Sequence, residues 1–259
     1  MKTTIISHIY NEEFLLPMWI NFHKNKFDEG IIVDYTSTDN SLKIIQNMAP
    51  SWRVIQSRNS HFSAKEVDEE LMEIEKSISG RRIILTSTEF FIGNPKSSGC
   101  EFTVVPSIEL ICGLGEIKMD LERPFHEQIF FGLSTEIRNP FRSRGNPKGR
   151  LFHNGLDILQ KSPVEYSLGR HYEVVNESPF LIYRVQDCLV DEKMIDRQLQ
   201  IQLRISNKDI SQNLGFSHHN EGRFLTRDTI LARNKILKSL SIDLREKIHQ
   251  AVTFEANCV

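Results

Sequence analysis

The sequence predicts an α/β protein with a mostly parallel central sheet flanked by helices, followed by a helical C-terminal portion. Two observations lead to this class. Over the first 110 residues, short β-branched or apolar runs alternate with segments whose apolar residues recur at helical spacing. That rhythm of strand and helix is typical of parallel sheets covered by helices. Beyond residue 190, helical spacing dominates.

The first strand is expected at Thr3–Ser7 (TTIIS). In the helix that follows, Leu15, Met18, Trp19 and Phe22 share one face, and Asn11 is a possible N-cap. The next elements of this half are a strand at Gly30–Asp34, a helix at Ser41–Met48 capped by Ser41, a strand at Arg53–Gln56, an acidic helix with Val67, Leu71, Ile74 and Ile78 inward and Gly80 at its end, and strands at Arg82–Leu85 and Phe102–Val105.

The second half of the chain is less regular. The basic segment Arg138–Arg150, rich in Gly and Pro, is expected to be a loop. A helix is predicted near Asp191–Ile205, and a last helix is marked by Leu237, Leu240, Leu244 and Ile248. With no clear linker in the chain, we expect a single domain covering residues 1–259.

Composition excludes several classes of protein. The 259 residues carry 32 Lys+Arg and 34 Asp+Glu, a net charge of −2 that does not suit a dedicated nucleic-acid binder. No apolar run reaches the roughly 18–20 residues of a transmembrane helix, and the N-terminus is too polar for a signal peptide. Cysteines 100, 112, 188 and 258 are widely spaced, which disfavours a zinc site and a disulfide framework and indicates a reducing, cytoplasmic setting.

Polar residues follow two neighbouring predicted strands. Ser7–Glu12 ends the first strand, and Asp34–Ser41 (DYTSTDNS) ends the second. A carboxylate at a strand end can accept hydrogen bonds from a nucleobase or ribose, and the next helix N-terminus attracts anions. The alternative is that Asp39 and Ser41 are only helix caps and Asp34 only forms a turn.

The segment Ile5–Ser41 resembles the donor-binding half of family-2-like glycosyltransferases with the GT-A fold, in a branch found in bacterial polysaccharide clusters and large algal viruses. In those proteins the second strand ends in a pattern like V-D-D-G-S-T-D-G-T. Asp34, Ser37, Thr38 and Asp39 match it, whereas Tyr35, Thr36 and Asn40 depart from it. The resemblance covers about residues 3–92.

The resemblance implies a GT-A, Rossmann-like fold with a nucleotide-sugar-binding half (1–110), an acceptor-side half (111–190) and a helical C-terminal portion (191–259). It also implies transfer of a sugar, most often from a UDP-sugar, to a glycan or lipid-linked hydroxyl with inversion. Asp34 would bind the base or ribose. The implied donor-binding residues are His8, Ile9, Tyr10, Asn11, Glu12, Asp34, Thr36, Ser37, Asp39, Lys65, Asp68, Thr86, Ser87 and Thr88. The alternative interpretation of the helix Lys65–Lys76 is that its acidic residues only form a solvated face.

The family holds a divalent cation with a D-x-D motif after the fourth strand. Here Thr86 and Thr88 replace both aspartates, leaving Glu89. Hydroxyls are poor ligands for Mn²⁺ or Mg²⁺, so either Glu89 binds metal almost alone or no metal is held tightly. We favour the second, and no cofactor is firmly implied. Another cation must then offset the charge on the leaving diphosphate. Candidates are the loop with Arg142, Arg144, Lys148 and Arg150, and also Arg204. The alternative interpretation of this loop is a solvated basic segment without a role in binding.

An inverting transfer also needs a general base. The choices in the acceptor-facing region are Glu116, Asp120, Glu122, Glu127 and Glu136, and the string Pro124–Gln128 favours Glu127. Glu89, beside the donor site, is a rival. His153, His171 and His218 are further candidates for contact with the donor, or else packed or surface histidines. Two other functions stay open: a nucleotide-sugar-binding module without turnover, and a sugar nucleotidyltransferase. Against the latter, the first loop lacks a Gly-rich, Arg-containing stretch.

Overall fold

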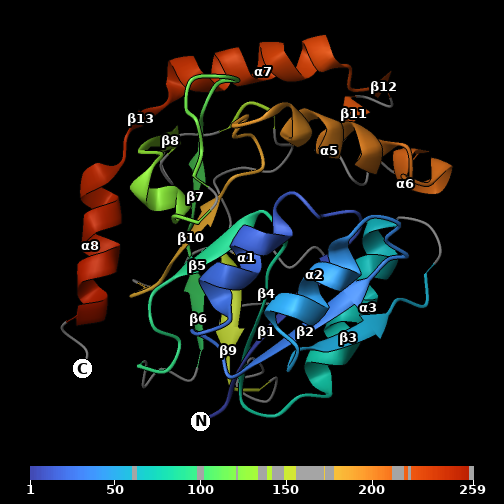
Figure 1. Ribbon diagram of the computed structural model, residues 1–259, viewed down its shortest axis with the longest axis vertical. Coiled ribbons are helices and arrows are strands. Elements are labelled where there is room, and N and C mark those ends of the chain that lie inside the picture. Colours follow the sequence, from blue (N-terminus) through green and yellow to red (C-terminus); the bar gives the residue numbers. More distant parts are fainter. Residues whose placement is uncertain are drawn as a thin grey trace.

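The computed structural model describes residues 1–59, 63–97, 102–120, 122–133, 139–141, 149–155, 172, 178–211, 219–220 and 223–256. A six-stranded sheet with the order β3-β2-β1-β4-β9-β6 lies at its centre (Figure 1). The first four strands run parallel, and β9 pairs antiparallel with both β4 and β6. The predicted α/β class with a mostly parallel sheet is confirmed. The strands are β1 (Thr3–Ile9), β2 (Glu29–Asp34), β3 (Arg53–Gln56), β4 (Arg81–Ile84), β6 (Phe102–Val105) and β9 (Arg150–His153).

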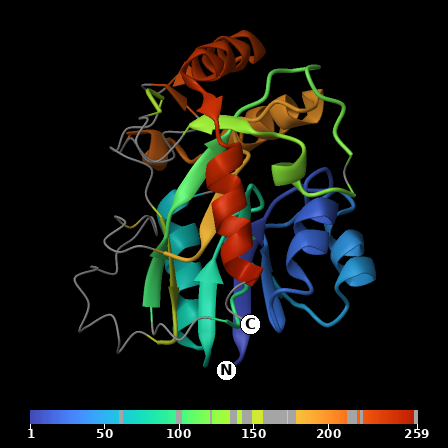
Figure 2. The same ribbon diagram turned by 90° about the vertical axis from the view of Figure 1, so that its left-hand side faces the viewer.

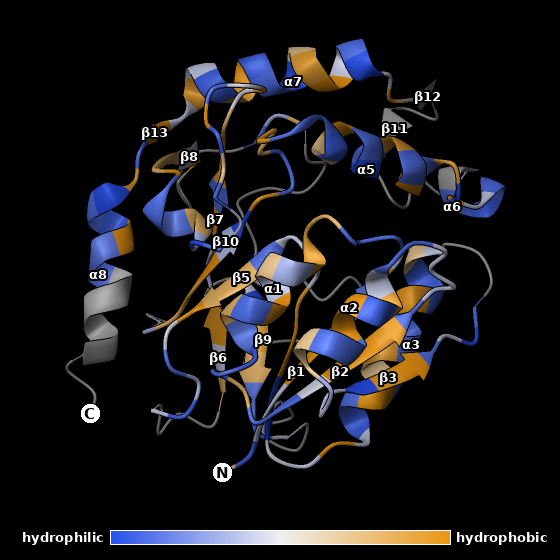
Figure 3. Ribbon diagram, viewed as in Figure 1, coloured by the Kyte–Doolittle hydropathy of each residue, from blue (hydrophilic) through white to orange (hydrophobic). Residues whose placement is uncertain are grey.

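Helices cover both faces of this sheet, because successive side chains of a strand point to opposite sides. Ile5 and Ile32 join the core cluster that contains residues of α1 and α2, whereas Ile6 and Ile31 pack with α3. Figure 3 shows the result as hydrophobic strands lying among helices of mixed character. The three helices are α1 (Leu16–His23), α2 (Ser41–Met48) and α3 (Ala64–Lys76).

A second sheet, in the order β13-β8-β7-β10-β5, was not predicted (Figure 2). Its strands have two to four residues each, and apolar runs this short carry little periodic signal. One core cluster joins the two sheets and includes residues from Ile5 to Ile248. The division at residues 110 and 190 stays a prediction. The strands are β5 (Glu89–Ile92), β7 (Ser107–Leu110), β8 (Phe131–Leu133), β10 (Leu181–Arg184) and β13 (Ile242–Asp243).

The C-terminal portion is helical, but the predicted last helix is wrong in one respect. The chain leaves α7 at Ser241, forms the short strand β13 against β8, and only then begins α8. The Leu244 N–H bonds to the Phe130 carbonyl at 2.7 Å instead of continuing α7. The remaining elements are the 3₁₀ turn η1 (Phe125–Glu127), α5 (Glu192–Gln202), α6 (Asn207–Ser211), β11 (His219–Asn220), β12 (Arg223–Phe224), α7 (Arg227–Leu240) and α8 (Arg245–Ala256).

Two predicted helix caps also differ from the structure. Helix α1 begins after Leu15 without a side-chain cap, and Asn11 instead accepts a hydrogen bond from the Thr38 N–H. Ser41 is the first residue of α2, and its hydroxyl accepts from the Glu12 N–H. Both side chains therefore join neighbouring turns rather than cap their own helix.

The acidic helix α3 does not expose all of its carboxylates, as the solvated-face interpretation expected. Glu70 and Glu75 are 6% and 3% exposed. Glu70 accepts hydrogen bonds from the Tyr35 hydroxyl at 2.9 Å and the Ser57 hydroxyl at 2.7 Å, and Glu75 contacts His153. Burial raises the pKa of Tyr35, and its bond to Glu70 raises it further, so the phenol stays neutral.

Cys112 and Cys188 are free and buried, while Cys100 and Cys258 lie outside the described residues. Among the helices that the structure describes, none is both long and apolar enough to cross a bilayer.

Candidate functional site

Two turns are bonded together at the edge of the sheet where β1 and β2 end. Parallel neighbours place their carboxyl ends side by side, as the sequence predicts for this pair. Asp39 accepts from the Ser41 N–H, as a cap would, but its other oxygen reaches the first turn, so capping is only part of its role. The bonds between the turns are Asn11 N–H to Ser37 Oγ (3.0 Å), Thr38 N–H to Asn11 Oδ1 (2.7 Å), Glu12 N–H to Ser41 Oγ (2.9 Å) and Glu13 N–H to Asp39 Oδ2 (3.0 Å).

Each of these turns contains a residue with a backbone conformation that side chains rarely adopt. Asn11 has φ of 50° and Thr36 has φ of 65°. Asparagine tolerates the left-handed region, but a β-branched residue there is a strained outlier. Thr36 is such a residue, so this turn carries backbone strain.

Replacing Thr36 with glycine is expected to raise the free energy of unfolding by about 1 kcal/mol, because relief of strain exceeds the added freedom of the unfolded chain. The side chain is exposed and accepts only a 3.4 Å bond from Gln56, so little is lost. Thr36→Ala keeps a Cβ, so its free energy of unfolding should lie between those of the wild type and Thr36→Gly. Urea denaturation measures this order, and an alanine variant more stable than the glycine variant would contradict it.

Asp34 closes β2 at the centre of this edge. Its carboxylate accepts from the Ser37 N–H at 3.2 and 3.3 Å, and the residue is 1% exposed. The Asp34 carbonyl accepts from the Gln56 side chain and the Ser57 N–H. Asp34 is therefore held in place by the backbone of the turn that it begins.

The turn after β4 brings a third set of residues to this edge. The hydroxyls of Thr86 and Thr88 lie 3.0 Å apart. Glu89 then begins β5 and is fully buried, with its carboxylate bonded to Arg150 (3.0 Å), Arg184 (2.8 Å) and the Thr86 N–H (3.0 Å). Burial alone would raise the pKa of Glu89, but the two guanidinium charges outweigh it and lower the pKa to about 2.

These residues do not fit a divalent cation. Two threonine hydroxyls stand where carboxylates would be needed, and the Glu89 oxygens are engaged by two arginines. Within the described residues no group of three or more His, Cys, Asp or Glu side chains is arranged to hold a metal. Neither a metal-binding nor a catalytic role for Glu89 gains support from this geometry, and both stay predictions.

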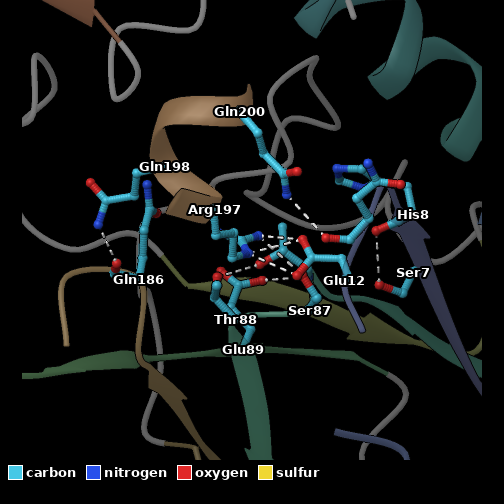
Figure 4. A network of polar contacts seen from close by, with 12 residues as sticks. Ser7, His8, Glu12, Ser87, Thr88, Glu89, Gln186, Arg197, Gln198 and Gln200 are labelled. Atoms are coloured by element: carbon cyan, nitrogen blue, oxygen red, sulfur yellow. Dashed lines mark hydrogen bonds and ion pairs between the residues drawn. The ribbon is translucent and has the colours of Figure 1, made fainter. Parts of the chain in front are cut away.

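Helix α5 crosses over the edge of the sheet and completes the site. Arg197 binds Glu12 through Nε at 2.8 Å and Nη2 at 2.6 Å, and Nη2 also donates to the Ser87 hydroxyl at 3.1 Å (Figure 4). Gln200 donates to the Asn11 carbonyl at 3.0 Å. Sequence reasoning missed Arg197 and Gln200, although they lie on the predicted helix, because nothing local connects them to a turn so far away in the chain.

Arg204 lies in the turn that follows α5. Its guanidinium lies 3.6 Å from the centre of the Tyr10 ring, a cation–π contact that places a positive charge beside the first turn. The structure therefore brings this predicted phosphate contact to the candidate site, together with Tyr10. His8 contacts the edge of the Tyr35 ring from β1, whereas the Ile9 side chain lies in the core, so only the Ile9 backbone faces the turn.

The beginning of α3 also reaches this side of the molecule. Ser63 caps the helix, and the buried carboxylate of Asp209 from α6 accepts from the Ala64 N–H at 2.8 Å. Lys65 is exposed and pairs with Glu69 at 3.6 Å, and Asp68 lies one turn further along, partly exposed. Asp209 is a third residue of the site that sequence reasoning missed.

Two predicted residues lie elsewhere. His153 pairs with Arg82 near the start of β4, so it lies away from the carboxyl edge. Its ring is fully buried between Glu75 (3.0 Å) and the Gly155 carbonyl (3.1 Å), and we do not keep it as a phosphate contact. Glu127 is exposed on η1, where it forms an ion pair with Arg123 at 3.5 Å. Arg142, Arg144, Lys148, His171 and His218 lie outside the described residues.

No known protein family matches the sequence, and no curated protein does. Distant solved structures include glucosyl-3-phosphoglycerate synthase from Mycobacterium tuberculosis with Mn²⁺, uridine-diphosphate-glucose and phosphoglyceric acid, at 15% identity, coverage of 42% of this chain and 44% of that chain, and a TM-score of 0.32. TarS 1–349 from S. aureus has 14% sequence identity, covers 91% of this chain and 71% of that chain, and has a TM-score of 0.37. The complex of TarS 1–349 with UDP has 11% sequence identity, covers 100% of this chain and 89% of that chain, and has a TM-score of 0.36. The match thus spans less than half of the synthase. At these low scores we take no residue role from either protein.

Proposed function

We propose that the protein is a glycosyltransferase that moves a sugar from a nucleotide-sugar to a hydroxyl group. The observation that carries this proposal is the meeting of the β1, β2 and β4 turns under α5, with Asp34 among them. Ligands of open α/β sheets bind at such an edge. The residues of Ile5–Ser41 that resemble family-2-like GT-A enzymes form two of these three turns, which supports a nucleotide in this place and a UDP-sugar as donor.

The reaction would be a single displacement. The acceptor oxygen forms a bond to the anomeric carbon, the bond from that carbon to the diphosphate breaks, and the electron pair leaves with the nucleoside diphosphate. The hydroxyl proton passes to a general base. Glu89 suits that role poorly, because a buried carboxylate with a pKa of about 2 is a weak base without access to an acceptor. Glu127 is exposed, but it lies on η1, outside the three turns. A glycan or lipid-linked acceptor and inversion at the sugar follow from the resemblance alone.

Asp34→Ala should weaken binding of UDP by at least about tenfold, the size expected when hydrogen bonds to a charged group are lost. Titration calorimetry with UDP measures this effect. Asp28→Ala is a matched control, because Asp28 lies at the opposite end of the sheet, where it bonds to Thr3 at the start of β1. Thermal melts of both variants check folding. Unchanged affinity in folded Asp34→Ala would remove the donor-site assignment.

A thermal-shift screen separates this function from the two alternatives, because a bound ligand raises apparent stability. A transferase should be stabilised by a nucleoside diphosphate and its sugar conjugate and should slowly hydrolyse one such conjugate. A module without turnover would bind but not hydrolyse any of them. A nucleotidyltransferase would bind a triphosphate more tightly than a diphosphate.

A further inference from the structure

The turn after β4 and the residues around it form an unusual charge arrangement. Glu12 and Glu89 are the two carboxylates, and Arg150, Arg184 and Arg197 are the three guanidinium groups bonded to them. Glu89 and its two arginines are buried, so solvent screens their charge poorly. Arg197 is the guanidinium that adjoins Ser87, so an anion at this turn would lie beside a positive charge.

Arg197 is the arginine of this group that contacts the Thr86–Thr88 turn itself, through Ser87. Its side chain is 11% exposed, against 9% for Arg184 and 4% for Arg150. Nε and Nη2 bond to Glu12 and Ser87, whereas Nη1 has no hydrogen-bond partner among the described residues. Figure 4 shows the guanidinium lying between Glu12 and Ser87. Glu12 therefore fixes the plane of the guanidinium and leaves one nitrogen free to donate.

We propose that Arg197 binds the diphosphate of the donor directly and that this site works without a divalent cation. This inference rests on the proposed function. Ser87 is the middle residue of the Thr86–Thr88 turn, so Arg197 lies where carboxylates would otherwise hold a metal. A planar guanidinium suits phosphate oxygens. During transfer it stabilises the electron pair that leaves with the nucleoside diphosphate.

The test compares UDP with uridine, which lacks the phosphates, by calorimetry in EDTA and in Mn²⁺. The wild-type protein should bind UDP about equally in both buffers. Arg197→Gln should weaken UDP binding at least about tenfold and change uridine binding less than about twofold, because Arg197 touches only the phosphates. The matched control is Arg227→Gln on α7, which breaks an exposed ion pair with Glu192 of α5 and should change neither affinity.

A second variant guards against a folding defect, because Arg197→Gln leaves the Glu12 carboxylate buried without its partner. Glu12→Gln combined with Arg197→Gln removes both charges, and it should show the same selective loss of UDP binding. If UDP bound only with Mn²⁺, or if Arg197→Gln bound UDP like the wild type, the inference would be overturned while the proposed function stood. If neither UDP nor uridine bound the wild type, the proposed function would fall as well.

Discussion

Replacing Glu89 with glutamine is expected to lower the free energy of unfolding by about 3–5 kcal/mol, the usual cost of breaking a buried ion pair. The carboxylate is completely buried and bonds to Arg150 at 3.0 Å and Arg184 at 2.8 Å. Glutamine keeps the shape but removes the charge. Two buried guanidinium groups would then lie side by side without the negative charge of Glu89, so their mutual repulsion and their lost hydration would be less well offset. Equilibrium unfolding in urea measures the loss.

The matched control for this experiment is Glu73→Gln. Glu73 also bonds to an arginine through both oxygens, with a 2.6 Å contact to Arg58, but both side chains are more than half exposed. Solvent screens such a pair, so the free energy of unfolding of this variant should remain close to that of the wild type. If Glu89→Gln lowered the free energy of unfolding no more than Glu73→Gln does, the structural role that we assign to Glu89 would be contradicted.

Lowering the pH from 7 to 5 is expected to remove about 2 kcal/mol of stability through His23 alone. Burial lowers the pKa of His23 from 6.5 to about 3. Phe91 N–H donates to Nε2 at 3.1 Å, so Nδ1 carries the proton and donates to the Trp19 carbonyl. The folded protein thus keeps this ring neutral at pH 5, whereas the unfolded chain takes up a proton below 6.5. The contribution of His23 is complete above that pH and decreases as the pH falls toward 3.

The measurement is the difference in unfolding free energy between pH 7 and pH 5, compared between the wild type and His23→Gln. The direct cost of the substitution cancels, because each protein is compared with itself. The variant should lose about 2 kcal/mol less than the wild type over this interval. Equal pH dependence in the two proteins would show that His23 is protonated in the folded state.

The first half of the fold could be predicted because its signals are local. The strands Arg53–Gln56 and Phe102–Val105 have the predicted bounds, and α2 ends at Met48 as predicted. The second sheet could not be predicted, because β5, β7 and β10 have four residues each and are buried throughout. Such strands show no alternation of polar and apolar residues. The split between α7 and α8 depends on pairing of β13 with β8, which is also a distant contact.

The same distinction applies to the candidate site. The turns that contain Asn11 and Ser37 were expected together, because they follow adjacent strands with matching polar residues. Arg197 was not expected, because an arginine on a helix has no local feature that separates an ion-pair partner from a solvated charge. The sequence indicates that Thr86 and Thr88 replace carboxylates, but it does not indicate that Glu89 is held by two arginines.

Two residues from the first third of the chain bond to residues that come very late. Glu12 in the first turn bonds to Arg197, 185 residues further on, and Ala64 at the start of α3 bonds to Asp209 at a separation of 145 residues. A chain leaving the ribosome therefore presents Glu12 and Ala64 long before their partners have been synthesised, and closing such large loops costs entropy. We expect nascent chains to bind a nucleoside diphosphate only once synthesis has passed α6, although most strands of the central sheet emerge much earlier.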